Sequence, residues 1–250
     1  MKAEKGLIGK KIGINQLFTS EGKVMAVTII EVLPNVVTQV KTTAKDGYQS
    51  LQLAAGYKRD KLMRKPLVGH LKKANTKNKR FFSEFRGMKN FDLGQEVSLS
   101  LFKSGDFVDI QAVSKGKGTA GVIKRHNFSR GPMSHGSKHH RAPGSIGISR
   151  PDKVWKGQPM PGRKGNENVT LQSLQVVKVD EKKNLLIVKG SIPGNNRSIC
   201  KIYPALRKKS AKNPFILYNY QSKSANVSKL KNKTLQVKDS TIDKSANNAT

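Results

Sequence analysis

The sequence predicts a mainly β protein: a β-barrel with a small α/β insertion, a long basic extension and a basic C-terminal tail. Many short segments rich in β-branched residues are separated by turn signals every ~8–12 residues, which favours a closed barrel over an open sheet. Residues 114–166 combine dense positive charge with many Gly and Pro residues and few apolar side chains. Such a segment cannot bury a core of its own.

Residues 1–113 are predicted to form the first part of the barrel. Strands are expected where β-branched or alternating apolar residues lie between turn signals such as Pro34, at residues 24–33, 35–41, 48–54, 95–102 and 106–113. An insertion is expected at about residues 58–90. It lacks β-branching near Pro66, where a short helix is predicted to begin.

Residues 167–206 are predicted to complete the barrel. Strands 169–179 and 185–189 flank a turn, and both are apolar enough to be mostly buried. This pair needs a sheet to join, and the unfinished sheet before residue 113 is available. Residues 114–166 are therefore expected to leave the barrel and return to it. Residues 207–250 are expected to be disordered in isolation, with 215–220 as their apolar part.

The charge of the chain indicates a polyanionic partner. The formal net charge is +32 on 250 residues, with a pI of about 10.4. Residues 115–166 carry twelve Lys or Arg residues against one acid, Asp152. A membrane is a weaker candidate, because no window approaches ~18 apolar residues and no apolar stripe of an interfacial helix is present. Nucleic acid is the favoured partner.

Arginine is concentrated in the extension although lysine dominates the chain. Five of the eleven Arg residues lie there, against 37 Lys in the whole sequence. A guanidinium presents a flat donor fork to phosphate and stacks on bases, which an ammonium cannot do. Geometry as well as charge is therefore expected to matter at these positions, with chance clustering as the alternative.

The extension offers no basis for catalysis, a metal or a cofactor. Its single carboxylate cannot form an acid–base pair. His135, His139 and His140 have no Cys or carboxylate beside them and are surrounded by cations, which opposes a divalent ion. The glycines of residues 114–121 lack the spacing of a nucleotide-binding loop. We expect no enzyme, no cofactor, no metal and no small-molecule substrate.

Cysteine content and the first residues indicate a reducing compartment. Cys200 is the sole cysteine, and its strand-like surroundings predict a small buried side chain. The first ten residues lack the apolar stretch of a secretory signal and the composition of an organelle presequence. The protein is expected to work where it is made.

Several motifs in the extension resemble one protein family. They are Ser114-Lys-Gly-Lys-Gly118, Gly121-Val-Ile-Lys-Arg-His-Asn-Phe128 and Arg130-Gly-Pro-Met-Ser-His-Gly-Ser-Lys-His-His-Arg-Ala-Pro-Gly-Ser-Ile-Gly147. These resemble the universal L-three family of large-subunit ribosomal proteins, in its bacterial or organellar form. Matches at residues 6–13, 153–170 and 184–194 extend the resemblance to residues 6–205. The tail after about residue 207 matches nothing expected of the family.

The resemblance implies a translation-factor-like β-barrel on the outer face of the large subunit. Its extension would thread through large-subunit rRNA toward the peptidyl transferase centre, support early assembly and leave catalysis to RNA. It implies as further partners the large-subunit proteins numbered fourteen and nineteen. The ribosome of a bacterial cytosol is the expected location, with an organelle stroma or matrix as the alternative. Many relatives carry a methylated glutamine after the Gly-Ser-Ile-Gly run. Residues 147–152 contain none, so that modification is not expected.

The residues expected to contact rRNA are the basic side chains of the extension with one serine and one tryptophan. They are Lys115, Lys117, Lys124, Arg125, His126, Arg130, His135, Lys138, His139, His140, Arg141, Ser145, Arg150, Lys153, Trp155, Lys156, Arg163 and Lys164. Trp155 is expected either to stack on RNA or to pack within a turn of the extension. A DNA-packaging protein and a nucleotide-dependent RNA-modifying enzyme are the alternatives. A DNA-packaging role would need a recognition helix, which the extension does not offer. An enzyme would need carboxylates that the extension does not supply.

Overall fold

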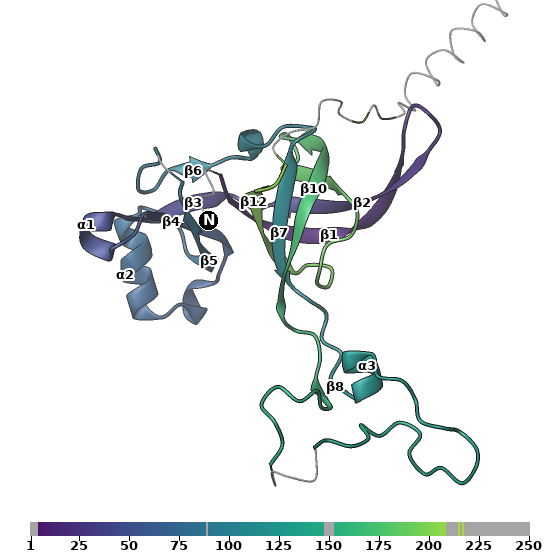
Figure 1. The fold of residues 1–250 in the computed structure, drawn as a ribbon. Coiled ribbons are helices and arrows are strands. Elements are labelled where there is room, and N and C mark those ends of the chain that lie inside the picture. Colours follow the sequence, from purple (N-terminus) through teal and green to yellow (C-terminus); the bar gives the residue numbers. More distant parts are fainter. Residues whose placement is uncertain (1–4, 89, 148–152, 209–214, 216, 218–250) are drawn as a thin grey trace, which may run out of the picture.

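The computed structural model describes residues 5–88, 90–147, 153–208, 215 and 217. Figure 1 shows a central barrel, a smaller α/β lobe at one side and a long loop hanging below the barrel. Most of the regular structure is strand, which confirms the prediction of a mainly β protein. The barrel strands are β1 (Leu7–Phe18), β2 (Val24–Val32), β7 (Phe107–Val113), β10 (Asn168–Asp180), β11 (Leu185–Lys189) and β12 (Ile199–Pro204).

The barrel is closed by antiparallel pairing in the order β1-β12-β7-β10-β11-β2, with β2 returning to β1. β7 and β10 are direct neighbours although the whole extension separates them in sequence. Their last pair before the extension is Val113 opposite Asn168. The extension therefore leaves and re-enters the barrel at one place, and both of its ends are held by the same strand pair.

The barrel core is formed by side chains that alternate along the strands. Ile30, Ile110, Leu186 and Ile202 are fully buried, and Ile110 lies opposite Ile202 on β12 and Leu171 on β10. Strand alternation places every second side chain inside, where burial stabilises the fold. Replacing such a residue with alanine costs about 2–5 kcal/mol.

The α/β lobe is larger than the sequence predicted. Its sheet has the order β5-β4-β3-β6, so the segments at 35–41 and 48–54 do not belong to the barrel. The expected insertion at about residues 58–90 is thus too short, because the lobe already begins at β3. Its elements are β3 (Asn35–Lys41), α1 (Thr43–Asp46), β4 (Ser50–Tyr57), the 3₁₀ turn Asp60–Leu62, α2 (Lys65–Lys73), β5 (Lys79–Arg86), β6 (Glu96–Val97) and the 3₁₀ turn Leu99–Leu101.

A buried amide joins the lobe to the barrel. Asn35 is completely buried, and its side-chain oxygen accepts a hydrogen bond from the Ile8 backbone N–H at 3.0 Å. Its amide nitrogen donates to the carbonyls of Ile8 and Leu33 at 3.2 and 2.7 Å. A buried amide is stabilising only when it is paired in this way. Asn35 therefore fixes the point where the chain turns from β2 into the second sheet.

Several other predicted elements differ from the structure. The helix near Pro66 is present as α2, but residues 79–86 form strand β5, which the lysine-rich sequence concealed. The strand expected at 95–102 is reduced to the two residues of β6 followed by a 3₁₀ turn. β1 was not predicted, because its lysines and glycines hide the alternation. Each of these strands is specified by its partner rather than by its own composition.

Cys200 is buried on β12, as predicted. Burial raises the pKa of its thiol to about 12. Because the thiolate is the nucleophile, we expect iodoacetamide at pH 8 to modify folded protein at least about 100-fold more slowly than unfolded protein. The rate of mass gain in native buffer and in denaturant measures this ratio. Comparable rates in both would contradict the assignment of Cys200 as an inert core residue.

Candidate nucleic-acid interface

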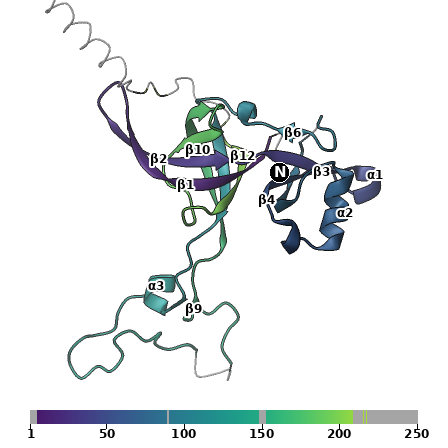
Figure 2. The same ribbon diagram turned by 180° about the vertical axis from the view of Figure 1, so that it is seen from behind.

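The extension has a base with regular structure and a tip without it. We define the base as residues 114–127 and 160–166, and the tip as residues 128–159. At the start of the base, Ser114 N–H donates to Glu167 O at 2.9 Å. Further out, Lys117 N–H donates to Lys164 O at 2.9 Å, and Lys164 N–H donates to Gly118 O at 3.0 Å. The ladder continues in β8 (Thr119–Ala120) and β9 (Gly162–Arg163), so the two barrel strands extend outward as a stalk (Figure 2).

Gly165 is required by this stalk. Its φ is +75°, and a Cβ there would lie 2.2 Å from the carbonyl oxygen of Lys115. Only glycine fits a left-handed conformation with such close backbone approach. Gly165 therefore lets the returning strand pack directly against the backbone of residues 115–117 on the outgoing strand.

A short helix, α3 (Val122–His126), crosses the stalk and is clamped to the returning chain. The Arg125 guanidinium donates from Nη1 to Met160 O at 2.8 Å, and His126 Nε2 lies 3.1 Å from the same oxygen. Val122 is buried against the stalk. The side chain of Lys164 reaches the carbonyls of Lys124 and Arg125 at the helix C-terminus. A cation at the C-terminal end of a helix pairs with its free carbonyl groups and interacts favourably with the negative end of the helix dipole.

The clamp adds to what the sequence predicts for the extension. The sequence predicts only that this segment cannot bury a core of its own. The base has intramolecular partners, and two residues predicted as RNA contacts, Arg125 and Lys164, supply them. Both are half-buried. Their side chains bond to backbone carbonyl oxygens of the base. The local sequence does not reveal these partners.

The tip is held by few contacts. Gly131 N–H donates to His140 O at 3.2 Å, and the His140 ring lies 3.0 Å from Pro132 O through Nδ1. A Cβ on Gly131 would lie 1.9 Å from His139 O, so the two chain segments touch at this glycine. The predicted histidine group therefore shapes the loop. Within the described ranges, no three His, Cys, Asp or Glu side chains are grouped as a metal site would require.

Most predicted contact residues present their side chains to solvent. The exposed ones are Lys115, Lys117, Lys124, His126, Arg130, His135, Lys138, His139, Arg141, Ser145, Lys153, Trp155, Lys156 and Arg163. His140 is half-buried, and Arg150 lies outside the described residues. Trp155 is 61% exposed, so most of its surface is open to a partner.

In the described part of the extension, no acid compensates the positive charge. The ion pairs in the described part of the chain join Lys10 to Glu31, Lys23 to Glu21, and Lys41 to Glu84, all away from the extension. Exposed cations without partners repel one another and attract a polyanion at long range. In the described ranges, no helix has both the length and the apolar character needed to cross a bilayer.

A loop of the barrel supports the root of the extension. Lys11 is buried, and its ammonium donates to the carbonyls of Ile192 and Gly194 at 2.6 and 3.1 Å. Burial, with a smaller effect of the Lys115 charge, lowers the pKa of Lys11. A Cβ on Gly194 would lie 2.7 Å from Val113 O, the last carbonyl of β7. Sequence patterns gave no sign of this buried cation, because lysine is common throughout the chain.

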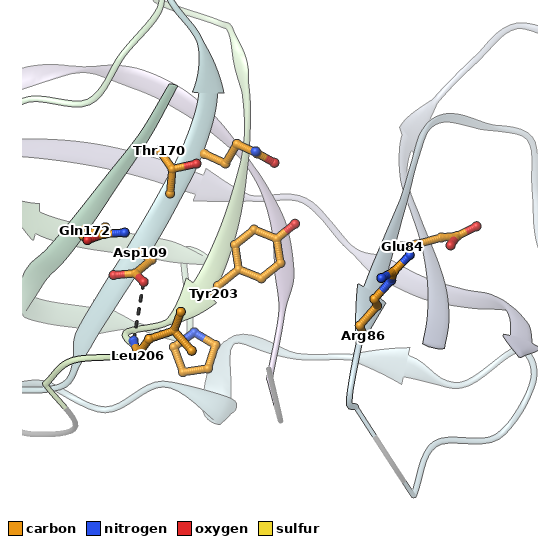
Figure 3. Close-up of a pocket in the computed structure, with 9 residues that line it drawn as sticks. Glu84, Arg86, Asp109, Thr170, Gln172, Tyr203 and Leu206 are labelled. Atoms are coloured by element: carbon orange, nitrogen blue, oxygen red, sulfur yellow. Dashed lines mark hydrogen bonds between the residues drawn. The ribbon is translucent and has the colours of Figure 1, made fainter. Parts of the chain in front are cut away.

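A cavity near the barrel lies away from the extension, between β5 of the lobe and strands β7, β10 and β12 (Figure 3). It measures about 590 Å³. Its buried carboxylate, Asp109, is already satisfied by the backbone N–H groups of Ser173 at 2.7 Å and Leu206 at 3.4 Å. Glu84, at its rim, is paired with Lys41. The acids around this cavity therefore hold the fold together and offer no acid–base pair.

The clamp predicts a local effect of Lys164. Lys164→Met removes the cation at the end of α3, so we expect amide hydrogen exchange over residues 122–127 to accelerate about 5-fold, equivalent to about 1 kcal/mol. The free energy of unfolding of the barrel should stay within about 0.5 kcal/mol. Lys156→Met, in the exposed tip, is the matched control. Equal exchange in both variants would contradict the clamp.

A barrel that projects a folded stalk with an exposed, uncompensated basic loop has the surface of a polyanion-binding protein rather than of an enzyme. Comparison with known proteins agrees. The sequence model of the family Ribosomal protein L3 matches residues 88–184. The protein described as "Large ribosomal subunit protein uL3" from Halalkalibacterium halodurans is 49% identical over 207 residues, covering 82% of this chain and 99% of the relative.

The chain belongs to the ribosomal protein L3 family. This confirms the family predicted from the motifs of the extension. It also confirms that the chain is not an enzyme, because the family is a structural one.

Proposed function

We propose that this chain is a structural constituent of the large ribosomal subunit that binds 23S-type rRNA through its extension. The relative carries the name of a large-subunit protein over nearly its whole length. The observation that carries the rRNA contact is the row of exposed cations on a stalk fixed to the barrel. Such a surface is complementary in charge to the phosphate groups of a nucleic-acid backbone. The expected location is therefore the ribosome in the cytoplasm.

The base and the tip would have different tasks. The clamp at Arg125 and Lys164 gives the stalk a fixed direction, while the tip adopts its final shape among RNA strands. An extended chain spans about 3.3 Å per residue, so a loop from His126 to Arg163 reaches at most roughly 60 Å from the base. That reach is enough to leave the subunit surface and approach the peptidyl transferase centre. The barrel, translation-factor-like by family resemblance, would stay on the outer face beside the proteins numbered fourteen and nineteen.

Binding during early assembly follows from the same physics. The positive charges of the loop repel one another, so binding is most favourable when RNA folds around the loop and neutralises them. The loop would therefore hold RNA segments that fold late together. Trp155, with its exposed ring, is placed to stack on an unpaired base. Arg141 and Arg163 would use their planar forks on phosphate or base.

Association with ribosomal particles tests the proposal. Tagged full-length protein should sediment with large subunits, and be absent from the nucleoid and from free protein fractions. Arg141→Lys or Arg163→Lys should lower subunit yield more than Lys156→Arg, since only the first two lose the planar fork. Sedimentation with the nucleoid would favour a DNA-packaging role. Equal yields for all three substitutions would show that these arginines supply charge alone.

A further inference from the structure

The lobe carries a second concentration of positive charge, separate from the extension. Residues 58–80 contain ten Lys or Arg residues and one acid, Asp60. Outside this segment, the extension at 115–166 and the tail at 207–250, the chain contains sixteen Lys or Arg residues and twelve acids. Charge is nearly balanced in that remainder, so the excess at 58–80 is a local feature of the lobe and not the average composition of the chain.

The cations of this segment are open to a partner. Eight of the ten have exposed side chains. The ion pairs in the described ranges all involve lysines and acids outside residues 58–80. Asp60 accepts a hydrogen bond from the side-chain amide of Asn78, so the single acid of the segment holds the loop in place. Exposed cations without acidic partners attract a polyanion.

Backbone hydrogen bonds hold this part of the lobe in a defined shape. In the 3₁₀ turn Asp60–Leu62, the Leu62 N–H donates to Arg59 O at 3.0 Å. The Lys58 N–H donates to Asn78 O at 3.3 Å, which ties the loop after β4 to the residue before β5. A surface that is already ordered loses less conformational entropy on binding than a flexible one. The lobe cations are therefore presented in a fixed arrangement.

An exposed aromatic ring lies among these cations. Tyr57, at the end of β4, is 65% exposed and is paired with Lys79 at the start of β5, so their side chains are neighbours. The ring of Tyr48, elsewhere in the lobe, has Lys41 and Arg86 over it. Among the described residues, no cation or second ring lies over the Tyr57 ring. We name this surface the lobe platform: Tyr57, Lys58, Arg59, Lys61, Lys77 and Lys79.

We propose that the lobe platform binds an unpaired nucleotide of ribosomal RNA, with its base stacked on Tyr57 and the neighbouring phosphates on the lobe cations. An aromatic ring beside basic side chains is the combination with which proteins bind single-stranded nucleic acid. An acidic protein segment would engage the cations but leave the ring unused. In Figures 1 and 2 the lobe lies at one side of the barrel and the extension below it, so the platform would contact a separate rRNA segment. The inference rests on the proposed function, because it takes the polyanion to be rRNA.

Directed cleavage of rRNA locates the contact in large subunits reconstituted with the full chain. A cysteine carrying an iron chelate cuts RNA around it, and the buried Cys200 does not compete for the label. Two positions are compared in separate chains: Leu62→Cys, which is 62% exposed beside the platform, and Ser137→Cys in the extension tip. We expect Leu62→Cys to cut an rRNA segment that Ser137→Cys does not cut.

Chemical probing of the same rRNA segment tests the stacked base. A nucleotide held on the Tyr57 ring is rigid, which slows acylation of its 2′-hydroxyl. Tyr57→Ala should raise acylation of one unpaired nucleotide in that segment at least about 5-fold, because the stacking surface is lost. Tyr57→Phe keeps the ring and is the matched control, in which that nucleotide should stay protected.

Salt dependence of rRNA binding by the full chain tests the phosphate contacts. Replacing three exposed platform cations, Arg59, Lys61 and Lys77, with Gln should lower the slope of log affinity against log salt by up to about two, as expected for single-stranded contacts. The control replaces three exposed lysines of the barrel, Lys178, Lys182 and Lys183, with Gln and should leave the slope unchanged.

Several results would overturn the platform alone while the Ser137→Cys cuts persist. Leu62→Cys could cut a neighbouring protein in place of RNA, cut nothing, or cut only the segment reached from the extension tip. Equal acylation in the Tyr57→Ala and Tyr57→Phe subunits would equally overturn the nucleotide site, as would equal salt slopes for the two triple variants. Absence of rRNA cuts from both cysteine positions would refute the proposed function itself, and the platform with it.

Discussion

Replacing the tip, residues 128–159, with a short Gly/Ser linker is expected to abolish stable rRNA binding while the barrel still folds. The tip carries six Lys or Arg residues and one acid. Each phosphate that a protein neutralises contributes about 0.7–0.9 to the slope of log affinity against log salt. Loss of the tip should lower this slope by up to about four and reduce affinity for rRNA at physiological salt on the order of 100-fold or more.

The barrel should tolerate this replacement because the base closes the loop on its own. His126 and Arg125 contact Met160, so the two ends to be joined already lie together. The free energy of unfolding should change by less than about 1 kcal/mol. Filter binding across a salt series and urea unfolding measure the two quantities. Lys182→Gln with Lys183→Gln, in the β10–β11 turn, is the charge control. If the control lost as much rRNA affinity for each removed charge as the tip replacement does, rRNA binding would depend only on the total charge of the protein.

Gly147→Trp is expected to alter the peptidyl transferase centre without disturbing the protein. A Cβ at Gly147 would meet no atom within 4 Å, and its φ is not positive, so the free chain accepts a bulky side chain. Any effect must then arise from what surrounds the tip in the ribosome. We expect the sensitivity of translation to drugs bound at that centre to change at least about 5-fold, equivalent to about 1 kcal/mol, with subunit yield preserved.

Gly69→Trp is the matched control for this substitution. Gly69 lies on α2 of the lobe, also with open space at its Cβ and no positive φ. The comparison uses drug titrations of peptide-bond formation on purified ribosomes that carry each variant. If Gly147→Trp ribosomes assembled normally and matched Gly69→Trp ribosomes in drug response, the extension would be only an anchor. Ser145→Trp, in the same exposed turn, provides a second variant with the same expected outcome.

Free protein should also show the division between base and tip. Trypsin should cut at Arg130, Lys138 and Arg141 early, because few backbone hydrogen bonds hold that segment. Cuts at Arg125, within the clamped base, should be at least about 10-fold slower. Time courses followed by mass spectrometry give both rates, and addition of rRNA should suppress the early cuts. Equal rates at Arg125 and Arg130 would contradict the division of the extension.

The amino-acid sequence by itself determined the chemical character of the protein. Charge balance within residues 115–166 is a local property, and it indicated the exposed basic loop before any fold was known. The motif around His135 and His139 identified the family. The apolar residues at 169–179 and 185–189 indicated two strands that need a sheet to join. These conclusions depend on side chains whose chemistry is the same in any fold.

Only the tertiary structure decided which partners those side chains meet. Residues 35–41 read as a strand in either sheet, and the buried Asn35 amide assigns them to the lobe. Arg125 and Lys164 look like their neighbours in sequence, yet each faces carbonyl oxygens of the base. Phe215 and Leu217 lie far along the chain from Met25, Val27 and Val177, against which they pack. Strand pairing and apolar contact are favourable with many partners, so the local sequence determines only the kind of interaction that a residue makes. The partner is decided by which distant segments the folded chain brings together.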